Sequence, residues 1–431
     1  MPQQRKIVGI AIAPMEGSLI RAYSIKGMKK SKRSKVSQRK DGVDLISNMP
    51  DAILLLILSR LPSTKEAIRS SILSRRWRNL WTAIPSLDIR YRKKFKKTKF
   101  KEFVYWVLAN KTVDLDRFRL CCDDYYSMSR VWRWTHMAVN RNVKQLDVSF
   151  YPKDETKAIE FPHCLVTCGS LEVLSFHGSY ISSRLSLPRF KGFLALRFLK
   201  LTDVDLLDDR VLVEDFLESC PSLEDLFLSD CVLCKLDLLC ISCPKLKTLS
   251  IDCEDEDGRC CDIKLSCPKL VDLDLTGHIR CNSFNERLDS LKQAVIEPKL
   301  AGNTISVLFP GISGVESLWI DLCFFSKCID AAHDPSLPNL KILWLTTTMD
   351  DFTMENFNQV LKYYPKLKCF KMNIEKDFHG KYQWLGEAKT KRILSRDVKR
   401  VEFFKFNGEQ PKLVIDWTID ILLLFFTWVL G

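Results

Sequence analysis

The sequence predicts an α/β protein in which a small three-helix domain precedes a solenoid, with a curved parallel sheet and short helices on its convex side. Three observations lead to this prediction. Residues 41–89 contain three helix signals around the apolar run Ala52–Leu58, and residues 141–380 repeat one leucine pattern. The composition, with 46% hydrophobic and 28% charged residues, is that of a globular protein.

The repeated pattern is L-x-x-L-x-L, with apolar residues at its first, fourth and sixth positions. Its copies begin at residues 143, 171, 196, 223, 246, 270, 291, 315, 340 and 367, which are 21 to 28 residues apart. This spacing is that of leucine-rich repeats, in which stacked neighbours bury the apolar face that no single repeat can bury. An ordinary α/β domain with leucine-rich strands is the alternative, and the near-constant period disfavours it.

The middle residue of each L-x-L segment points away from the leucines, because side chains alternate along a strand. We therefore expect on the concave face Ser175, Lys200, Phe227, Ser250, Asp274, Trp319, Trp344 and Lys371. Aromatic side chains at solvent-facing positions are frequent binding hot spots. The predicted target-binding residues are Phe227, Trp319, Trp344 and Lys371. The alternative is that the C-terminal segment or a loop covers the tryptophans.

Residues 41–89 predict three short helices. Pro50 and Asp51 favour the first, because proline fits the first helical turn and an early carboxylate suits the helix dipole. The capping box Ser63-x-x-Glu66 predicts the second, and Ser74 is a candidate cap for the third. The run Ala52–Leu58 is apolar all round but far shorter than the ~20 residues of a membrane span. It must be covered by the rest of the chain or by a partner helix.

Three segments of this stretch carry a family resemblance: Ile46-Ser47-Asn48-Met49-Pro50-Asp51-Ala52-Ile53-Leu54, Ile57-Leu58-Ser59-Arg60-Leu61-Pro62 and Ser74-Arg75-Arg76-Trp77-Arg78-Asn79-Leu80-Trp81. Together they resemble the plant type of F-box. Met49 stands where leucine is usual, and Arg60 stands where an apolar residue is common.

The resemblance implies a function. An F-box binds a Skp-family adaptor and through it a cullin, which makes this chain the non-catalytic substrate-recognition subunit of an SCF-type ubiquitin ligase. The positions that match the family's adaptor contacts are Met49, Pro50, Ile53, Leu54, Ile57, Leu61, Ile68 and Trp77. The sequence leaves open which of them are core and which are interface.

The positive charge is concentrated in the first forty residues. They contain eleven Lys or Arg and one acid, Glu16, and so carry +10 of the net +13. We expect a disordered basic tail, in which Lys29–Lys35 is either a nuclear localisation signal or a solvated segment. The expected location is the nucleus, the cytoplasm or both, and translation from Met28 would leave this cluster in place. Two other functions remain open: a non-ligase scaffold, and a nucleic-acid-associated protein acting through the tail.

The seventeen cysteines do not form a disulfide pattern, because their number is odd and no convincing secretory signal precedes them. The pairs Cys231–Cys234 and Cys240–Cys243 have zinc-like C-x-x-C spacing but are only five residues apart. Cys243 also occupies a Cys-Pro slot that recurs with the repeat, at Cys220 and Cys267. We therefore predict buried structural cysteines, no metal and no cofactor. The six histidines are scattered and form no catalytic motif.

Residues Asp397–Gly408 resemble the start of the FBD region of plant F-box/leucine-rich-repeat proteins. The predicted organisation is a basic tail (1–40), an F-box (41–89), a linker or start of the solenoid (90–140), leucine-rich repeats (141–380) and a degenerate FBD-like region (381–431). The final apolar segment Ile421–Leu430 is too short to span a membrane.

Overall fold

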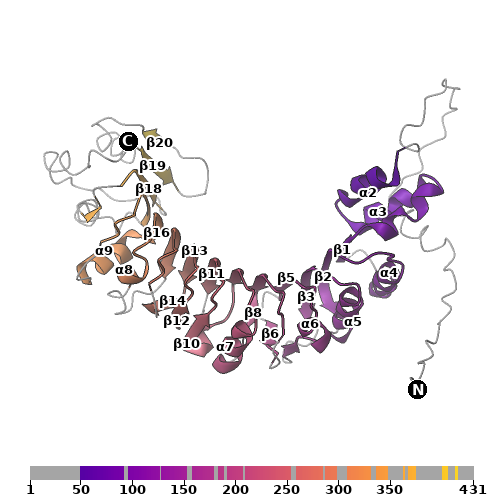
Figure 1. The fold of residues 1–431 in the computed structure, drawn as a ribbon, viewed down its shortest axis with the longest axis horizontal. Coiled ribbons are helices and arrows are strands. Elements are labelled where there is room, and N and C mark those ends of the chain that lie inside the picture. Colours follow the sequence, from indigo (N-terminus) through magenta and orange to yellow (C-terminus); the bar gives the residue numbers. More distant parts are fainter. Residues whose placement is uncertain are drawn as a thin grey trace, which may run out of the picture. The chain divides into compact units, whose positions relative to one another are not determined.

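The computed structural model describes residues 49–91, 96–126, 128–152, 158–178, 183–188, 192–206, 209–253, 259–284, 287–298, 308–331, 336–347, 363–364, 367–374, 400–405 and 413–415. The chain divides into two units (Figure 1). Residues up to 89 and residues 110–113 form the first, and residues 90–109 and those from 114 onward form the second. The predicted basic tail lies outside the described residues.

The first unit is a small helical domain. It consists of α2 (Asp51–Ser59), α3 (Thr64–Arg69) and three 3₁₀ turns, η1 (Ser70–Ile72), η2 (Arg76–Arg78) and η3 (Leu80–Ala83). The core of this unit includes Leu54, Leu58, Trp77 and Trp81, whose exposed fractions are 0 to 5%. The first two helices begin where the sequence predicted.

Two details of the helix prediction are wrong. The Ser63 side chain makes no cap hydrogen bond. Its carbonyl accepts from the backbone N–H groups of Glu66 and Ala67, while Glu66 forms an ion pair with Arg69 at 2.7 Å. The third predicted helix consists of η2 and η3 instead. These turns are too short to repay the cost of nucleating an α-helix, and tertiary contacts hold them.

Two side chains tie the first unit together. The Arg76 guanidinium donates to Asp51 Oδ1 at 2.6 Å and to the Met49 carbonyl at 2.5 Å, which links η2 to the start of α2. Lys111, only 3% exposed, donates from Nζ to the carbonyls of Trp81, at 3.0 Å, and Ile84. The Trp81 carbonyl also accepts from the Ile84 N–H at 3.3 Å, so Lys111 adds a second donor there and links the end of η3 to residues 110–113.

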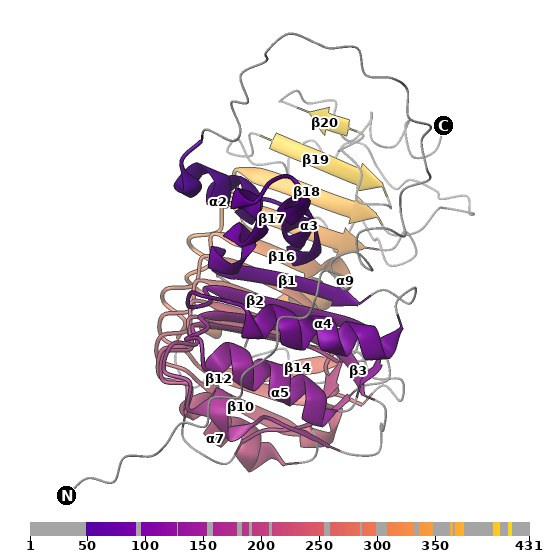
Figure 2. The ribbon, with the colours of Figure 1, turned by 90° about the vertical axis from the view of Figure 1, so that its right-hand side faces the viewer.

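The second unit is built on one long sheet. Its parallel strands, in spatial order, are β2 (Arg117–Tyr126), β3 (Gln145–Pro152), β5 (Val173–His177), β7 (Phe198–Thr202), β9 (Asp225–Ser229), β11 (Thr248–Cys253), β13 (Asp272–Gly277), β15 (Gln293–Pro298), β16 (Ser317–Asp321), β17 (Ile342–Thr347), β18 (Cys369–Ile374) and β19 (Arg400–Lys405). The strand β20 (Leu413–Ile415) pairs with β19 in the antiparallel sense. Figure 2 shows β16 to β19 lying side by side.

The predicted repeat register is confirmed. Each of the ten repeat copies places its first residue two positions before a strand of this sheet, as Leu171 precedes Val173 and Leu340 precedes Ile342. The leucine positions are buried and the positions between them are partly exposed, as in β5, β7 and β9. The sheet also includes β2 before the first copy and β19 after the last, so it extends beyond residues 141–380 at both ends.

The outer side of the sheet carries both helices and short strands (Figure 1). The helices are α4 (Lys97–Ala109), α5 (Met128–Val139), α6 (His163–Val166), α7 (Arg210–Glu218), α8 (Leu308–Gly311) and α9 (Leu322–Ala331). Two small parallel sheets comprise β4 (Ile159–Glu160), β6 (Ser183–Ser186) and β8 (Val204–Asp205), and β10 (Leu238–Ser242), β12 (Cys261–Ser266) and β14 (Ile279–Phe284). The helix α7 lies between these two groups of strands.

The predicted short helices are therefore present, and short strands that the sequence did not predict lie on the same side. The 27-residue repeat from 196 to 223 accommodates α7, whose start is capped by the Asp209 side chain accepting from the Leu212 N–H at 3.0 Å. The shorter repeats that follow leave fewer residues between sheet strands, and an extended segment returns in fewer residues than a helix. Within the described ranges, no helix is both long and apolar enough to cross a membrane.

Candidate binding surfaces

The first unit exposes an apolar row on one face of α2. Ile53, Leu56 and Ile57 are 44%, 51% and 42% exposed, respectively. Their spacing of three and four residues places them on one side of the helix, while Leu54 and Leu58 pack into the core. Ile72 and Leu73 are even more exposed, at 66% and 64%. This is a large apolar surface for so small a unit.

The structure separates the predicted adaptor contacts into three groups. Pro50, Ile53 and Ile57 are exposed, and Met49 and Leu61 are half-buried. Three others are buried in the unit and serve as its core: Leu54, Ile68 and Trp77. The sequence prediction missed three exposed apolar residues, Leu56, Ile72 and Leu73, although the helical spacing of Leu56 from Ile53 was a signal for the first of these.

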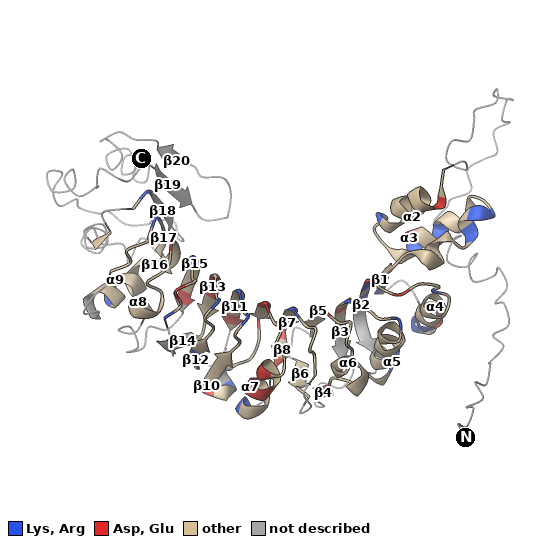
Figure 3. Ribbon diagram, in the orientation of Figure 1, with Lys and Arg blue, Asp and Glu red and all other residues tan. Residues whose placement is uncertain are grey.

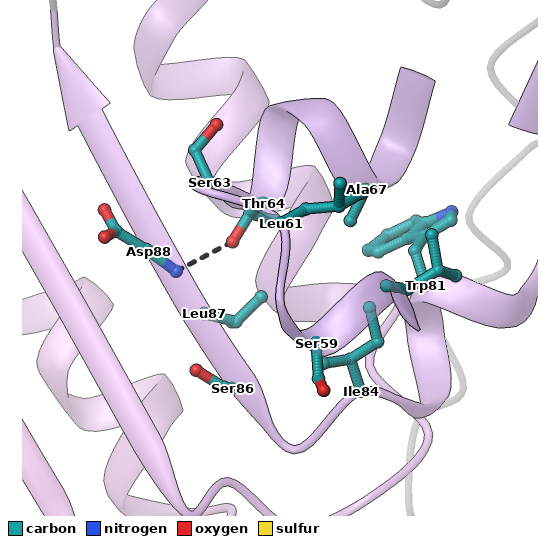
Figure 4. A pocket seen from close by; sticks show the side chains of 11 residues that line it. Ser59, Leu61, Ser63, Thr64, Ala67, Trp81, Ile84, Ser86, Leu87 and Asp88 are labelled. Atoms are coloured by element: carbon teal, nitrogen blue, oxygen red, sulfur yellow. Dashed lines mark hydrogen bonds between the residues drawn. The ribbon is translucent and has the colours of Figure 1, made fainter. Parts of the chain in front are cut away.

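A shallow hollow in the first unit lies between α3, η3 and the start of β1 (Ser86–Tyr91) (Figure 4). The backbone N–H of Asp88 donates to Thr64 Oγ1 across one side of it, at 2.8 Å. Its volume of about 30 Å³ has room for a water molecule but not for an organic ligand. The apolar surface is therefore the better candidate for binding.

The second unit presents a central row of side chains on the inner face of its sheet. Strand pairing places all the predicted middle residues in register, with Val295 between Asp274 and Trp319: Ser175, Lys200, Phe227, Ser250, Asp274, Trp319, Trp344 and Lys371. All of them are half-buried, whereas the leucines beside them are buried. The predicted row therefore exists as one continuous surface.

Trp319 and Trp344 form a stacked pair on this row. Their ring centroids are 4.1 Å apart and their planes differ by 4°. The Lys371 Nζ lies 4.9 Å from the centroid of Trp344 and continues the stack. Trp319 Nε1 donates to Thr346 Oγ1 at 2.7 Å, and that hydroxyl donates to Glu297 Oε1 at 2.6 Å. These bonds fix the orientation of Trp319 without a ligand.

Phe227 does not belong to this stack, so the four predicted target-binding residues do not form one cluster. Three strands, β11, β13 and β15, separate β9 from β16. Phe227 pairs instead with Phe198, with ring centroids 5.2 Å apart. The C-terminal residues 416–431, which were the alternative cover for the tryptophans, lie outside the described residues.

Acidic side chains lie on the three strands that precede β16 in the sheet. Asp252, Asp274 and Glu297 stand on β11, β13 and β15, of which β15 is the direct neighbour of β16. Burial raises the pKa of Asp274, a hydrogen bond from Ser250 opposes this shift, and the charges of Asp252 and Glu297 raise the pKa further. This part of the face is therefore a site of negative potential.

The cysteines of the repeat slots are buried. Cys220, Cys243 and Cys267 are 0 to 3% exposed, as is Cys231. Burial raises the pKa of Cys220 and of Cys243 to about 12 and also raises that of Cys231, which disfavours the thiolate that binds zinc. In the part of the chain that the structure describes, no three His, Cys, Asp or Glu side chains are placed to hold a metal ion. The side chain of Cys234 lies outside that part.

A helical unit with an exposed apolar face, joined to a solenoid of leucine-rich repeats, defines the class of the protein. Two family models match the chain. The F-box domain matches residues 46–87, and the LRR domain of At1g61320/AtMIF1 matches residues 107–424, which is more than half of the chain.

Proteins of Arabidopsis thaliana show the same combination. F-box/LRR-repeat protein 13 is 32% identical over 339 residues, covering 70% of this chain and 71% of that protein. FBD-associated F-box protein At5g22730 is 27% identical over 87% of this chain and 84% of its own length. F-box/FBD/LRR-repeat protein At5g56420 is 31% identical, and the alignment covers 61% of this chain but only 64% of that relative. The chain belongs to the plant F-box/leucine-rich-repeat family.

Proposed function

We propose that this protein is the substrate-recognition subunit of a cullin-based ubiquitin ligase of the SCF type. The F-box unit binds a Skp-family adaptor, and the inner face of the repeats holds a protein target. The single observation that best supports the first part is the apolar row Ile53, Leu56 and Ile57 within the stretch that matches the F-box model.

The apolar row favours a partner on energetic grounds. Fully burying an aliphatic side chain contributes about 1.5–3 kcal/mol, so covering side chains that are about half exposed contributes on the order of 1 kcal/mol each. Together with Ile72 and Leu73, five such side chains supply several kcal/mol toward association. A folded adaptor that presents an apolar groove is the partner type that this surface fits.

In this proposal the chain supplies no chemistry of its own. The F-box fixes the protein within the ligase, and the repeats hold the target near the ubiquitin-loaded enzyme. Acceleration then comes from proximity and orientation. The stacked tryptophans support a protein target, because rigid aromatic pairs on an open face provide contact area at low entropic cost.

The test is co-purification of the full chain with a Skp-family adaptor. Pro50→Ala combined with Ile53→Asp places a charge in the contact and should abolish co-purification, since burying an unpaired carboxylate costs several kcal/mol. The matched control is Val211→Asp on α7, which is 65% exposed in the other unit. Normal yield of adaptor with the Pro50/Ile53 variant would contradict the proposal, and so would equal loss in the control.

A further inference from the structure

Lysine and arginine gather on the first two helices of the second unit, α4 and α5, as Figure 3 shows. These helices and the residue before α4 hold six cations and one acid, Glu102, a net charge of +5. Five of the cations are exposed and Lys101 is half-buried. The six are Lys96, Lys97, Lys99, Lys101, Arg130 and Arg133. We call this surface the basic helix face.

The two helices pack firmly against each other, so the basic helix face is a preformed surface. Trp134 of α5 meets Phe100 and Tyr105 of α4 edge to face, with ring centroids 6.1 and 6.0 Å apart. Phe100 and Trp134 are buried, as are Val104 and Val131. The apolar sides of both helices are therefore used for packing within the unit. The 13 residues of α4 span about 20 Å, which gives the charged face a broad extent.

The cations of the basic helix face repel one another. Burial lowers the pKa of Lys101, and the positive charges of Arg130 and Lys97 lower it further. Lys101, Arg130 and Arg133 form no ion pair with a carboxylate among the residues that the structure describes. By contrast, cations at the starts of several sheet strands are paired with glutamates. An anionic partner would remove the repulsion that the helices leave uncompensated.

The shape and composition of the basic helix face favour a membrane over a nucleic acid. Nucleic acids are bound in basic grooves or by a helix that enters a DNA groove. Here the cations lie on the outer side of two helices that are packed into the unit. Four of the six cations are lysines, whose point charges suit a diffuse layer of headgroups, whereas recognition of bases favours arginine. Tyr105 and Trp106, both half-buried on α4, are residue types enriched at membrane surfaces.

We propose that the basic helix face binds the surface of a membrane that contains anionic lipids. A cluster of about four to eight Lys and Arg on an amphipathic helix is typical of such binding. The contact is electrostatic and peripheral, because the apolar sides of the helices are packed inside and do not insert. Each cation near an anionic surface strengthens binding about fivefold. This proposal does not depend on the ligase role.

The test is co-sedimentation of the purified full chain with phosphatidylcholine vesicles that contain either no charged lipid or about 30% phosphatidylserine. We expect binding to the charged vesicles only. Lys101→Gln combined with Arg130→Gln and Arg133→Gln should weaken this binding by about 100-fold, and Arg133→Gln alone by about fivefold. Glu102→Gln, which removes the one acid of the two helices, should strengthen it by about fivefold.

A matched control separates the basic helix face from overall net charge and from the basic tail. Lys245→Gln combined with Lys269→Gln and Lys292→Gln removes three exposed cations from other repeats and should change binding by less than about twofold. The tail is present in every variant. Unchanged vesicle binding by the triple variant of α4 and α5, equal loss in the control, or equal binding to uncharged vesicles would overturn the proposal.

The same proteins are titrated with a DNA duplex, single-stranded RNA and polyglutamate at the same ionic strength. If the wild type binds one of these more tightly than the charged vesicles and the triple variant of α4 and α5 loses that binding, the face belongs to that partner and the membrane assignment is wrong. All variants should keep the unfolding midpoint of the wild type, since the substituted side chains lie at the surface. The single substitution Arg133→Gln, at an exposed position, tests the proposal even if the triple variant unfolds.

Discussion

The two units treat their apolar side chains in opposite ways. In α2 of the F-box unit, buried Leu54 and Leu58 alternate with Ile53, Leu56 and Ile57, which are 42 to 51% exposed. In β11 of the repeats, Leu249 and Ile251 are fully buried, and Ser250 between them is partly exposed on the inner face of the sheet. The F-box unit thus exposes an apolar row, while the described strands of the repeats present a row of polar side chains interrupted by aromatic pairs, Phe198 with Phe227 and Trp319 with Trp344.

The difference follows from how each unit gains a core. A chain of some forty residues has too little interior to bury all of its leucines and isoleucines. A solenoid gains interior with every repeat, because each new strand covers the apolar side of the previous one. Under the proposed function, the apolar surface binds the adaptor, and the polar and aromatic groups on the long face bind the target.

The largest expected effect breaks the apolar surface directly. Ile53→Asp combined with Ile57→Asp should reduce adaptor affinity by about 100-fold or more, because two carboxylates lose water on binding without gaining partners. Since both positions are exposed, the free protein should remain folded. Titration calorimetry of the purified chain with the adaptor measures the loss, and unchanged affinity would show that α2 is not the contact.

A matched pair of leucines separates core from surface within α2. Leu54→Ala should lower the free energy of unfolding of the F-box unit by about 2–5 kcal/mol, because Leu54 is 0% exposed and truncation leaves a cavity. Leu56→Ala, at a position 51% exposed, should change it by less than about 0.5 kcal/mol while weakening adaptor binding. Chemical unfolding of both variants checks this, and equal destabilisation would contradict the assigned burial.

The tryptophan stack is the corresponding test on the repeats. Trp319→Ala combined with Trp344→Ala should weaken target binding by about 30-fold, since truncating an aromatic anchor typically costs 2 kcal/mol or more. Phe227→Ala is the comparison variant, because Phe227 lies three strands away in a separate pair with Phe198. Both the double tryptophan variant and Phe227→Ala should bind the adaptor as tightly as the wild type does. Target affinity that falls as much in Phe227→Ala would mean that the site is not centred on the tryptophans.

Ionisation of cysteine thiols at alkaline pH should lower the stability of the repeats but not that of the F-box unit. The sequence of residues 41–89 contains no cysteine, whereas the repeats bury Cys220 and Cys243, whose pKa values burial raises to about 12. These thiols ionise in the unfolded chain near pH 8.5 but stay neutral in the folded repeats. Their contribution to stability is therefore complete below that pH and is lost as the pH rises toward 12.

Unfolding midpoints between pH 7.5 and 10.5 measure this effect. The midpoint of the repeats should fall more steeply in the wild type than in a Cys220→Ala/Cys243→Ala variant. Identical slopes would mean that these thiols do not contribute to the pH dependence of stability.

Native mass spectrometry of the same samples tests the prediction that the protein holds no zinc, which one tightly bound zinc per chain would refute.

The sequence predicted the repeats well because their signal is periodic. A residue such as Leu171 or Leu340 fixes the register of its strand, and a shift of one residue would turn the leucines outward. From that register the adjacency of Trp319 and Trp344 follows, and strand pairing confirms it. The outer strands β10, β12 and β14 could not be predicted from the sequence, because the short segments between the strands of the long sheet have no clear helical or strand periodicity.

The F-box was harder to predict in detail. Its motif located the helices, but which face of α2 is covered depends on packing against η3, which contains the buried Trp81, and sequence spacing does not reveal this packing. Leu54 and Ile57 therefore look alike in the sequence, although only Leu54 is buried. The acidic environment of Trp319 was also missed, since Asp252, Asp274 and Glu297 lie on three repeats and become neighbours only through strand pairing.

The most direct measurement of the central claim, that the two units bind different partners through different surfaces, is a paired capture in cells with the proteasome blocked. Wild type, the Ile53/Ile57 variant and the Trp319/Trp344 variant are isolated, and the bound proteins are quantified by mass spectrometry. We predict that the first variant loses the adaptor and cullin but keeps the targets, and that the second keeps the adaptor and loses the targets. A captured set that is the same for wild type and the tryptophan variant, or loss of both classes of partner in either variant, would contradict the claim.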